Sequence, residues 1–487
     1  MGKKGSVESD PMKILLIKPP QNPSLATNSV YEPLDLEYLA ASVPGAEVRI
    51  LDMRIENRLM QELTGFRPDL VGIGAYTCDY NTTVDLLGRI KKYEATIRTV
   101  VGGHHATFLP SDFALTCVDA VFLGYADTTF PMYVEAFNDR DRIRNIPNLA
   151  LVENGSITFT RKETFEPDLK TLPLPDRSKT KRYRKYYHDP LLNRMALVMT
   201  SRGCPYRCNF CACWKLMNGK YASRTPESIV EELRSLPVED EIVYFSDDNT
   251  FHDIGRMWKL SELIRTNGVR KKLQMYARAD TIVKHGELFS DLVKSGLKFI
   301  TIGIESFQNE DLDYFRKKTT VDINNQAIRI LKKLDIYILA HFVVRPQYSE
   351  NDFDRLMDYV YDNNLFRPAF PVLTPLPGTD LYADTRNDFV VTNLDLFDFA
   401  HSILPTRLES KVFYRRLTSL YVKSFSAWRY LKHRFWRGIS SNLPRYYTDN
   451  TDGITLTRLL LLYLYTLKSF IKLRYSPVKN HSSFIPK

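Results

Sequence analysis

The sequence predicts an α/β protein with three parts, and three observations lead to that prediction. Short apolar strands alternate with helical stretches between residues 12 and 124, which is typical of a doubly wound, Rossmann-like domain. A second series of six strand–helix units runs from residue 196 to residue 375 and predicts a partial, TIM-like (β/α)6 barrel. From residue 388 onward the pattern is helical, aromatic and basic.

The first series comprises five candidate strands, at residues 12–18, 46–51, 69–76, 97–103 and 119–124. The segment 80–93 between two of them has apolar residues at helical spacing. In doubly wound sheets ligands lie at the carboxyl ends of the strands. The polar and glycine-rich ends here are AYTCDYN and GGHHAT, so a ligand site is expected at these two loops.

Residues 151–192 are proline-rich, basic and free of periodicity, which predicts a linker. The second series follows, with candidate strands at 196–201, 241–247, 273–279, 298–306, 337–345 and 369–375. Thr225 is the expected N-cap of the first helix, with Pro226 at its first position. The expected domains are therefore 1–150, 151–192, 193–387 and 388–487.

Composition fits a soluble protein of two or three domains. The 487 residues are 44% hydrophobic and 25% charged, and no apolar run reaches the 18 residues of a spanning helix. We expect no signal peptide and therefore a cytoplasmic location. Residues 401–487 contain 16 Lys and Arg against 3 Asp and Glu, so the net charge of +10 resides in this last segment.

Four of the six cysteines lie within ten residues, in SRGCPYRCNFCACWK (201–215). Cys78 and Cys117 stand alone in the sequence. So few cysteines favour a protein of a reducing compartment, in which disulfides are not expected. A structural zinc site usually draws its ligands from two separated knuckles, and no second knuckle is present. Three thiolates on an iron–sulfur cluster would leave one iron open, as a catalytic cluster requires.

The spacing CxxxCxxC of Cys204, Cys208 and Cys211, with Phe210 before the last cysteine, resembles the radical S-adenosylmethionine (SAM) superfamily. The resemblance implies that these three cysteines hold a [4Fe–4S] cluster and that SAM binds its fourth iron. Cys213 has no place in this pattern and is expected to be a small buried side chain or a nearby thiol.

Further motifs resemble the same superfamily: SDDNTF (246–251), ARAD (277–280), GIES (303–306) and LTPLPGTDLY (373–382). At the fifth strand HFVVRPQYSENDF departs from the family, because Arg345 and Pro346 stand where many relatives have glycines. The resemblance implies SAM contacts from Phe210, Asp247, Asp248, Arg278, Glu305, Ser306, Arg345 and Pro377.

VVGGHHATFLP resembles the GGxH loop of cobalamin-binding domains attached to radical SAM enzymes. EPLDLEYLAA (32–41) resembles another conserved block of that domain. VDAVFLGYAD (118–127) resembles a third block, but it has GYAD where the family usually has GEGE. The implied cobalamin contacts are Tyr76, Thr77, Gly102, Gly103, His105 and Gly124. The DxHxxG motif that supplies an axial histidine elsewhere is absent, so cobalt is expected to lack a protein histidine below it.

The resemblance implies a C-methyltransferase of the class B type. A 5′-deoxyadenosyl radical would abstract hydrogen from an unactivated carbon, methylcobalamin would donate the methyl group, and a second SAM would remethylate cobalt. Oxidative cyclisation or ring rearrangement without methyl transfer is the first alternative. A cobalamin or cluster sensor is the second, although the intact sixth-strand motif argues against it.

The stretches 398–421 and 341–353 look most like the hopanoid C-3 methylase group. The basic, aromatic tail also suits an anionic membrane surface, where a polycyclic lipid would be collected. The alternative is that the tail helices cap the barrel, with their basic residues solvated outside. The expected partners are therefore a hydrophobic or lipid substrate, the inner face of a membrane and an electron donor such as flavodoxin or ferredoxin. A nucleic acid is not expected, because no RNA-binding module is recognisable.

Overall fold

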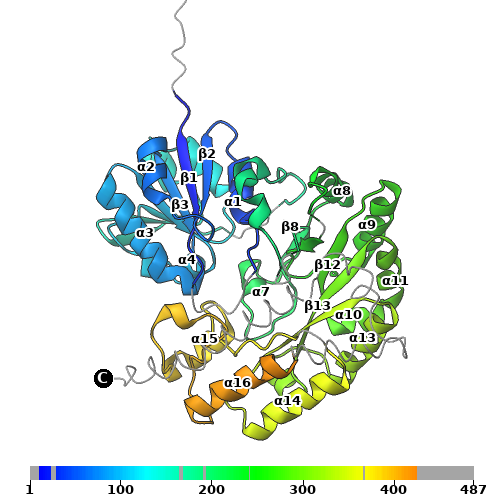
Figure 1. Cartoon of the computed structure of the whole chain (residues 1–487). Coiled ribbons are helices and arrows are strands. Elements are labelled where there is room, and N and C mark those ends of the chain that lie inside the picture. The colour runs from blue at the N-terminus through cyan, green and yellow to red at the C-terminus, as the bar shows by residue number, and fades with distance from the viewer. Residues whose placement is uncertain are drawn as a thin grey trace, which may run out of the picture. The chain divides into compact units, whose positions relative to one another are not determined.

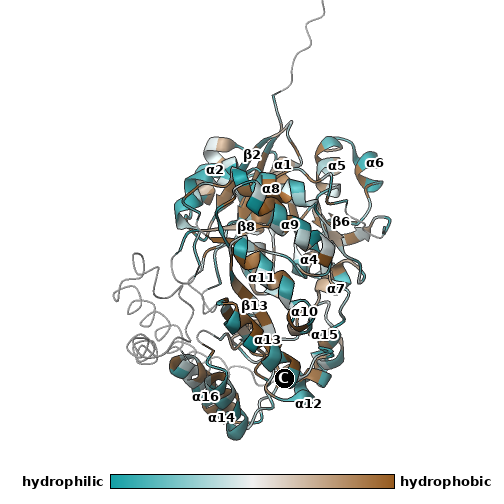
Figure 2. Ribbon diagram, turned by 90° about the vertical axis from the view of Figure 1, so that its right-hand side faces the viewer, coloured by the Kyte–Doolittle hydropathy of each residue, from teal (hydrophilic) through white to brown (hydrophobic). Residues whose placement is uncertain are grey.

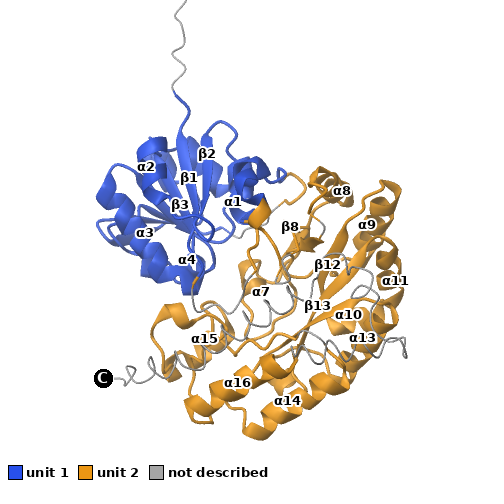
Figure 3. Cartoon of the chain, in the orientation of Figure 1, with its two compact units in different colours: residues 1–21, 33–165, 172–184 blue, residues 22–32, 166–171, 185–487 orange. Residues whose placement is uncertain are grey.

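The computed structural model describes residues 10–22, 29–163, 168–189, 193–240, 242–365 and 368–424. The chain divides into two compact units (Figure 3). Unit 1 comprises residues 1–21, 33–165 and 172–184, and unit 2 comprises residues 22–32, 166–171 and 185–487.

Unit 1 is built on a seven-stranded sheet in the order β2-β1-β3-β4-β5-β6-β7 (Figure 1). The first five strands are parallel, and β6 and β7 add antiparallel at one edge. The strands are β1 (Lys13–Lys18), β2 (Glu47–Asp52), β3 (Leu70–Gly74), β4 (Arg98–Gly102), β5 (Ala120–Phe122), β6 (Leu149–Glu153) and β7 (Ser156–Phe159). Because β1 lies between β2 and β3, the strand order reverses there, and the crevice at the ends of β1 and β3 is the expected ligand position.

Apolar side chains cover both faces of this sheet, as expected for a parallel sheet between helical layers. The helices of the unit are α1 (Leu34–Ala41), α2 (Leu59–Phe66), α3 (Tyr80–Tyr93), α4 (His104–Phe108), α5 (Thr129–Glu135) and α6 (Arg140–Arg144), with short 3-10 turns η1 (Thr77–Asp79) and η2 (Pro110–Phe113). The doubly wound prediction is confirmed.

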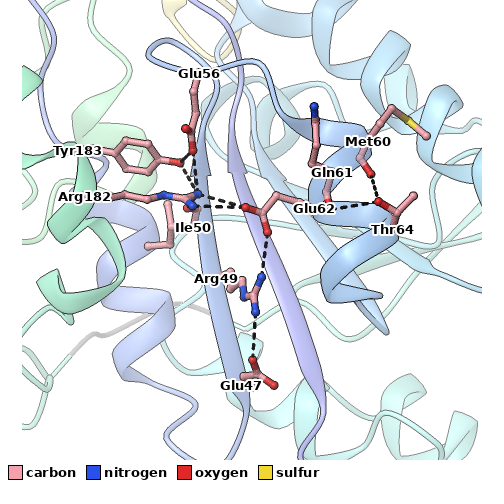
Figure 4. A network of polar contacts seen from close by, with 10 residues as sticks. All are labelled: Glu47, Arg49, Ile50, Glu56, Met60, Gln61, Glu62, Thr64, Arg182 and Tyr183. Carbon is pink, nitrogen blue, oxygen red and sulfur yellow. Dashed lines mark hydrogen bonds and ion pairs between the residues drawn. The ribbon is translucent and has the colours of Figure 1, made fainter.

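The domain boundary expected after residue 150 falls inside β6, so unit 1 extends beyond it. The expected linker 151–192 is only partly a linker, because β7 and the 3-10 helix η3 (Arg177–Tyr186) lie within it. Residues 172–184 return to unit 1, and Figure 4 shows how they are held. Arg182 pairs with Glu56 at 3.0 Å and with Glu62 at 3.3 Å, and the Tyr183 hydroxyl donates to Glu56.

Unit 2 contains a five-stranded parallel sheet in the order β14-β13-β12-β11-β8. The strands are β8 (Met195–Val198), β11 (Ile242–Phe245), β12 (Lys272–Ala277), β13 (Leu297–Glu305) and β14 (Tyr337–Phe342). The expected sixth strand is present only as two parallel bridges, His341 with Ala369 and Val344 with Val372. A separate antiparallel pair, β9 (Ser201–Arg202) and β10 (Ala222–Ser223), flanks the cysteine segment.

Helices pack on the outer face of this sheet, where the large apolar core lies. Figure 2 shows their hydrophilic sides turned away from the brown strands. They are α8 (Pro226–Ser235), α9 (Ile254–Thr266), α10 (Ala279–Lys284), α11 (Gly286–Lys294), α13 (Val321–Lys333) and α14 (Glu350–Asp362), and the short helix α12 (Asn309–Tyr314) follows β13. Thr225 caps α8 as predicted, because its hydroxyl accepts from the Ser228 amide at 3.2 Å.

After the barrel come α15 (Asp380–Thr385), the 3-10 turns η4 (Arg386–Asp388) and η5 (Leu394–Leu396), and α16 (Ser410–Ser424). Phe413, Tyr414, Leu417 and Leu420 of α16 join the main core of unit 2. Residues 425–487, which carry most of the predicted basic helical region, lie outside the described residues. Within the part of the chain that the structure describes, no helix is long and apolar enough to cross a membrane.

Candidate active site

The cysteine segment (201–215) follows the carboxyl end of β8, the first strand of the sheet in unit 2. It begins with β9 and runs into the helix α7 (Cys213–Leu216). Gly203 starts the loop with a φ of +84°, and a Cβ at this position would overlap the Lys220 carbonyl oxygen. Only glycine combines this left-handed backbone with so close an approach. The path of the cysteine loop therefore depends on Gly203.

Two carboxylates from the end of β11 hold the backbone of this loop. Asp247 accepts hydrogen bonds from the amides of Thr200 at 2.6 Å and Ser201 at 2.9 Å. Asp248 accepts from the Gly203 amide at 2.7 Å. Both are predicted SAM contacts. In the structure both carboxylates accept hydrogen bonds from the backbone of this loop. Their contact with SAM stays a prediction.

Cys204, Cys208 and Cys211 lie close enough to affect one another electrostatically, and Cys208 is buried. Burial raises the pKa of Cys204 to about 11 and also raises that of Cys208. The pKa of Cys211 is lowered, because the Cys213 thiol donates a hydrogen bond to its sulfur. Cys213 is thus the nearby thiol that the sequence predicted, and it also interacts with Asp248.

The donor set fits a cluster better than a single ion. Among the described residues, no group of three or more His, Cys, Asp or Glu side chains is arranged to hold one metal ion. A four-iron cluster offers a separate iron to each thiolate, so its ligands need not converge on one point. The positive side chains Lys317 and Arg278 oppose the effect of burial on the pKa of Cys208 and would favour its thiolate.

Glu305 ends β13 beside the cysteine loop and forms a buried ion pair with Lys317. Their nitrogen and oxygen atoms are 2.6 Å apart, and the side chains are 8% and 6% exposed. Glu305 has a left-handed φ of +61°, an uncommon state that concentrates at functional sites. Gly303 leaves the room for this pair, because a Cβ there would overlap the Glu305 carboxylate. Burial lowers the pKa of Lys317, but Glu305 and Cys208 outweigh it and the net shift is upward.

Arg278 connects three parts of the site at the end of β12. Its guanidinium lies 3.5 Å from the ring centroid of Tyr206 in the cysteine loop. It pairs with Asp280 at 3.0 Å and donates to the Lys317 carbonyl at 2.8 Å. Arg278 is a predicted SAM contact that here fixes the cysteine loop relative to Lys317.

Ser306 and Arg345, two further predicted SAM contacts, both bind the buried Asp311. The Ser306 hydroxyl donates at 2.8 Å, the Arg345 guanidinium at 2.5 Å and the Tyr348 hydroxyl at 3.0 Å. Asp311 therefore stabilises the turn that follows β13. Sequence reasoning missed this residue.

Phe210 and Pro377 have packing roles around the same loop. The Phe210 ring meets Phe315 edge-on at 5.3 Å, within a small apolar cluster that also contains Leu381. Pro377 is buried in the turn before α15, and the Leu381 amide of that helix donates to the Asn209 carbonyl at 2.9 Å. The sixth-strand motif is thereby tied to the cysteine loop.

The inner face of the sheet in unit 2 carries side chains that the sequence analysis did not single out. Leu197, Tyr244 and Leu339 belong to one partly buried cluster on this face. The rings of Tyr276 in β12 and His341 in β14 lie 6.4 Å apart across the intervening strand β13, and burial lowers the pKa of His341. These residues alternate along their strands with residues of the outer core, so period-two reading of each strand would have found them.

In unit 1 the predicted glycines bring the ends of β3 and β4 together. Gly103 has a φ of +96°, and a Cβ there would lie 2.8 Å from the Ala75 carbonyl oxygen. At Gly124, with a φ of +78°, nothing lies within 4 Å of the Cβ position. The first glycine permits a close backbone approach, and the second leaves open space for a bulky ligand.

Comparison with known proteins decides the class. The family model described as "B12 binding domain" matches residues 25–134, and that of the "Radical SAM superfamily" matches residues 198–360. The chain is a cobalamin-binding radical SAM enzyme. Its cofactors are a [4Fe–4S] cluster, SAM and cobalamin.

Relatives and folds agree with this class. The enzyme is 28% identical over 420 residues to the hopanoid C-3 methylase of Methylococcus capsulatus, a match that covers 85% of this chain and 79% of the relative. It is 25% identical to the anaerobic magnesium-protoporphyrin IX monomethyl ester cyclase of Cereibacter sphaeroides over 71% of this chain and 58% of that one.

Solved structures of two cobalamin-dependent enzymes share the fold. OxsB, solved with aqua-cobalamin and SAM, has a TM-score of 0.69 at 14% identity and covers 98% of this chain and 82% of its own. TsrM from Kitasatospora setae, solved with cobalamin and a [4Fe–4S] cluster, has a TM-score of 0.64 at 16% identity and covers 77% and 78%.

The cobalamin domain of the enzyme uses its GGxH histidine internally. His105 is fully buried, and its ring nitrogens contact the Thr77 hydroxyl at 3.2 Å and Asp112 at 3.1 Å. Both ring nitrogens are therefore engaged by side chains of the same domain. Thr77, another predicted cobalamin contact, is held by this histidine.

Lys18 ends β1 and Tyr76 follows β3, at the place where the strand order of the same domain reverses. Tyr76 is 56% exposed, and the Lys18 ammonium lies 5.1 Å from its ring centroid and 3.7 Å from Asp35. Sequence reasoning found Tyr76 but missed Lys18, whose position at the end of an apolar strand was the available signal. Cobalamin contact by Tyr76, Thr77, Gly102, Gly103, His105 and Gly124 stays a prediction.

Proposed function

We propose that this enzyme transfers a methyl group to an unactivated carbon of a hydrophobic substrate, a hopanoid lipid at C-3. The observation that carries the proposal is the match to the hopanoid C-3 methylase, which extends over 85% of the chain and so includes both domains and residues beyond them. The inner face of the barrel supports it, because Leu197, Tyr244 and Leu339 offer an apolar and aromatic surface to a polycyclic hydrocarbon.

The protein contributes positioning and exclusion of water in this scheme. The thiolates of Cys204, Cys208 and Cys211 would hold the cluster, and the Glu305–Lys317 pair lies beside them to orient the polar groups of SAM. When bound, the cluster supplies the electron that cleaves SAM, and cobalamin supplies the methyl group. The aromatic inner face keeps the reacting carbon away from solvent.

Oxidative cyclisation without methyl transfer is the second candidate. The similarity to the magnesium-protoporphyrin IX monomethyl ester cyclase favours it, although this chain spans only 58% of that relative. The two candidates differ in their products, because only a methyl transfer converts a second SAM to S-adenosylhomocysteine.

Two parts of the proposal concern partners. An acidic electron carrier, such as flavodoxin or ferredoxin, would reduce the cluster. Peripheral binding to an anionic membrane would rest on the basic segment 401–487, most of which lies outside the described residues.

The substrate is tested with the full chain reconstituted with iron, sulfide and cobalamin under anaerobic conditions. We expect a purified hopanoid, supplied with methyl-deuterated SAM and reductant, to gain a deuterated methyl group that mass spectrometry places on the ring bearing C-3. Leu339→Trp would fill the inner face, so it should lower lipid methylation at least about tenfold while SAM cleavage continues.

Val238→Trp is the matched control, because Val238 is 89% exposed and does not belong to the inner face. It should methylate the lipid at the wild-type rate. A wild-type enzyme that cleaves SAM but leaves every hopanoid unlabelled would refute the proposed substrate.

A further inference from the structure

Lys317 is a buried cation beside the cysteine loop that no sequence motif singles out. The chain that follows α12 is tied to this loop at Asn209. The Asn209 amide donates to the Phe315 carbonyl at 3.2 Å, and its side-chain amide donates to the Tyr314 carbonyl at 2.7 Å. Because Asn209 is the neighbour of Cys208 in the sequence, the chain that carries Lys317 lies against a predicted cluster ligand.

The backbone on either side of Lys317 turns this one side chain inward. Arg316 and Lys318 have left-handed φ angles of +52° and +53°, which residues other than glycine rarely adopt. Both are exposed, whereas Lys317 between them is buried. The Arg278 guanidinium donates to the Lys317 carbonyl at 2.8 Å and fixes the turn from the barrel side. A strained backbone and a buried guanidinium therefore hold an ammonium group inside the protein.

The Lys317 ammonium is directed at Cys208 more than its counter-ion is. It donates to the Glu305 carboxylate at 2.6 Å. Burial raises the pKa of Cys208, and Lys317 opposes this rise more strongly than Glu305 adds to it. The positive end of the buried ion pair thus faces a predicted ligand of the cluster.

Other charges act on the same loop in both senses. Arg278 also opposes the effect of burial on the pKa of Cys208, and its guanidinium pairs with Asp280 at 3.0 Å. The Asp248 carboxylate accepts from the Gly203 amide at 2.7 Å and brings a negative charge to the loop. The contribution of Lys317 is therefore a difference between this cation and a neutral side chain in its place, and it does not depend on the sum of the other charges.

The reduction potential of an iron–sulfur cluster depends on the charges, hydrogen bonds and solvent exposure around its sulfur atoms. A buried cation favours the reduced state, because that state carries one more negative charge. We propose that Lys317 raises the reduction potential of the cluster and that Glu305 limits the rise. One electron passes from an external one-electron donor, which is oxidised, to the bound cluster, which is reduced, and no bond forms or breaks. The proposal rests on the cluster but not on the identity of the methyl acceptor.

The test measures the potential of the cluster itself in the full-length enzyme reconstituted with iron, sulfide and cobalamin. Samples are poised with redox mediators, and the electron paramagnetic resonance signal of the reduced cluster is read. SAM is left out, because Glu305 is a predicted SAM contact. Lys317→Met should weaken reduction about tenfold, which corresponds to a potential about 59 mV lower. Lys317→Arg keeps the charge and should restore most of the wild-type potential.

Two further variants separate charge from packing. Glu305→Gln removes the anion of the pair and should raise the potential. The double variant Lys317→Met with Glu305→Gln removes both charges and leaves no buried charge unpaired. Its potential should lie below that of the wild type, because the cation is the charge directed at Cys208. A loss of packing would move both single variants in the same direction, so opposite shifts identify an effect of charge.

Lys318→Met is the matched control. Lys318 is the next residue in the chain and is exposed, so solvent and salt screen its charge. The potential of this variant should equal that of the wild type. Iron and acid-labile sulfide are measured in every sample, so that only protein that holds the cluster is compared.

A double variant whose potential equals or exceeds that of the wild type would overturn the proposal, even if Lys317→Met alone failed to hold the cluster. A shift of the same size in Lys318→Met would also overturn it, because the effect would then belong to the net charge of the protein. None of these measurements involves SAM cleavage or lipid methylation, so a failure of the proposed substrate would be recognised separately.

Discussion

At the scale of single residues, Cys213 lies beside one of the three cysteines that we predict to hold the cluster. Its thiol donates to Cys211 and contacts Asp248, which in turn holds Gly203. Cys213 therefore acts on a predicted cluster ligand, and we expect that it is not a ligand itself.

Cys213→Ala should keep the iron and sulfide content of the reconstituted protein close to the wild-type value, because three thiolates remain. Cys211→Ala, two residues away, should lose most of both, since a ligand is removed. Iron and acid-labile sulfide assays with the visible absorption spectrum measure this. Loss of the cluster in Cys213→Ala as well would show that the fourth cysteine is a ligand.

His104 predicts a pH dependence in the cobalamin domain. Burial lowers the pKa of His104 to about 4, so below pH 6.5 the unfolded chain binds a proton that the folded chain refuses. The local stability should fall by up to about 3 kcal/mol as the pH drops from 6.5 to 4. Hydrogen exchange of the α4 peptide, corrected for intrinsic rates, should show this loss in the wild type and not in His104→Gln. Equal slopes in both proteins would contradict the account.

The residues that the sequence missed share one physical cause. Lys317 stands between Arg316 and Lys318, and the sequence suggests three solvated cations. In the structure Arg316 and Lys318 are exposed, whereas Lys317 is buried against Glu305. Asp311 likewise lies on a short acidic helix. A spacing motif identifies residues that lie close together in the sequence. Lys317 and Asp311, in contrast, meet their partners only after the strands have assembled.

At the scale of elements, the glycine-initiated cysteine loop carries the site. Gly203 and Gly219 both have a left-handed φ, of +84° and +75°, but only Gly203 is crowded by neighbouring atoms. An alanine at Gly219 would therefore introduce backbone strain alone, whereas an alanine at Gly203 would introduce backbone strain and steric overlap.

Gly219→Ala should cost about 1 kcal/mol of stability from the left-handed backbone alone. Gly203→Ala should cost about 3 kcal/mol or more, because the Lys220 carbonyl must move as well. Denaturant unfolding followed by tryptophan fluorescence, which includes Trp214 of α7, measures both, and cluster content should fall only in Gly203→Ala. Equal costs would show that the loop relaxes freely.

Most strands of both sheets could be predicted from the sequence, because buried parallel strands are continuous apolar runs between turn signals. The antiparallel strands β6 and β7 could not, since β7 is short and largely exposed. The expected sixth barrel strand, PVLTP in a proline-rich context, forms only bridges. Proline lacks the amide that a continuous ladder needs.

At the scale of the whole molecule, the sequence located both cofactor domains and the class of chemistry. It could not place the inner face of the barrel, because that face gathers residues from several distant segments. We propose that these two domains work together in methyl transfer, a property of the whole chain that neither domain shows by itself.

The most direct test is the ratio of SAM products from the reconstituted full chain with a hopanoid, cobalamin and reductant. Methyl transfer consumes one SAM as the radical source and one as the methyl source. We therefore predict 5′-deoxyadenosine and S-adenosylhomocysteine in nearly equal amounts, each matching the methylated lipid. 5′-Deoxyadenosine formed together with a changed product, but without S-adenosylhomocysteine, would contradict the methyltransferase and favour cyclisation or rearrangement.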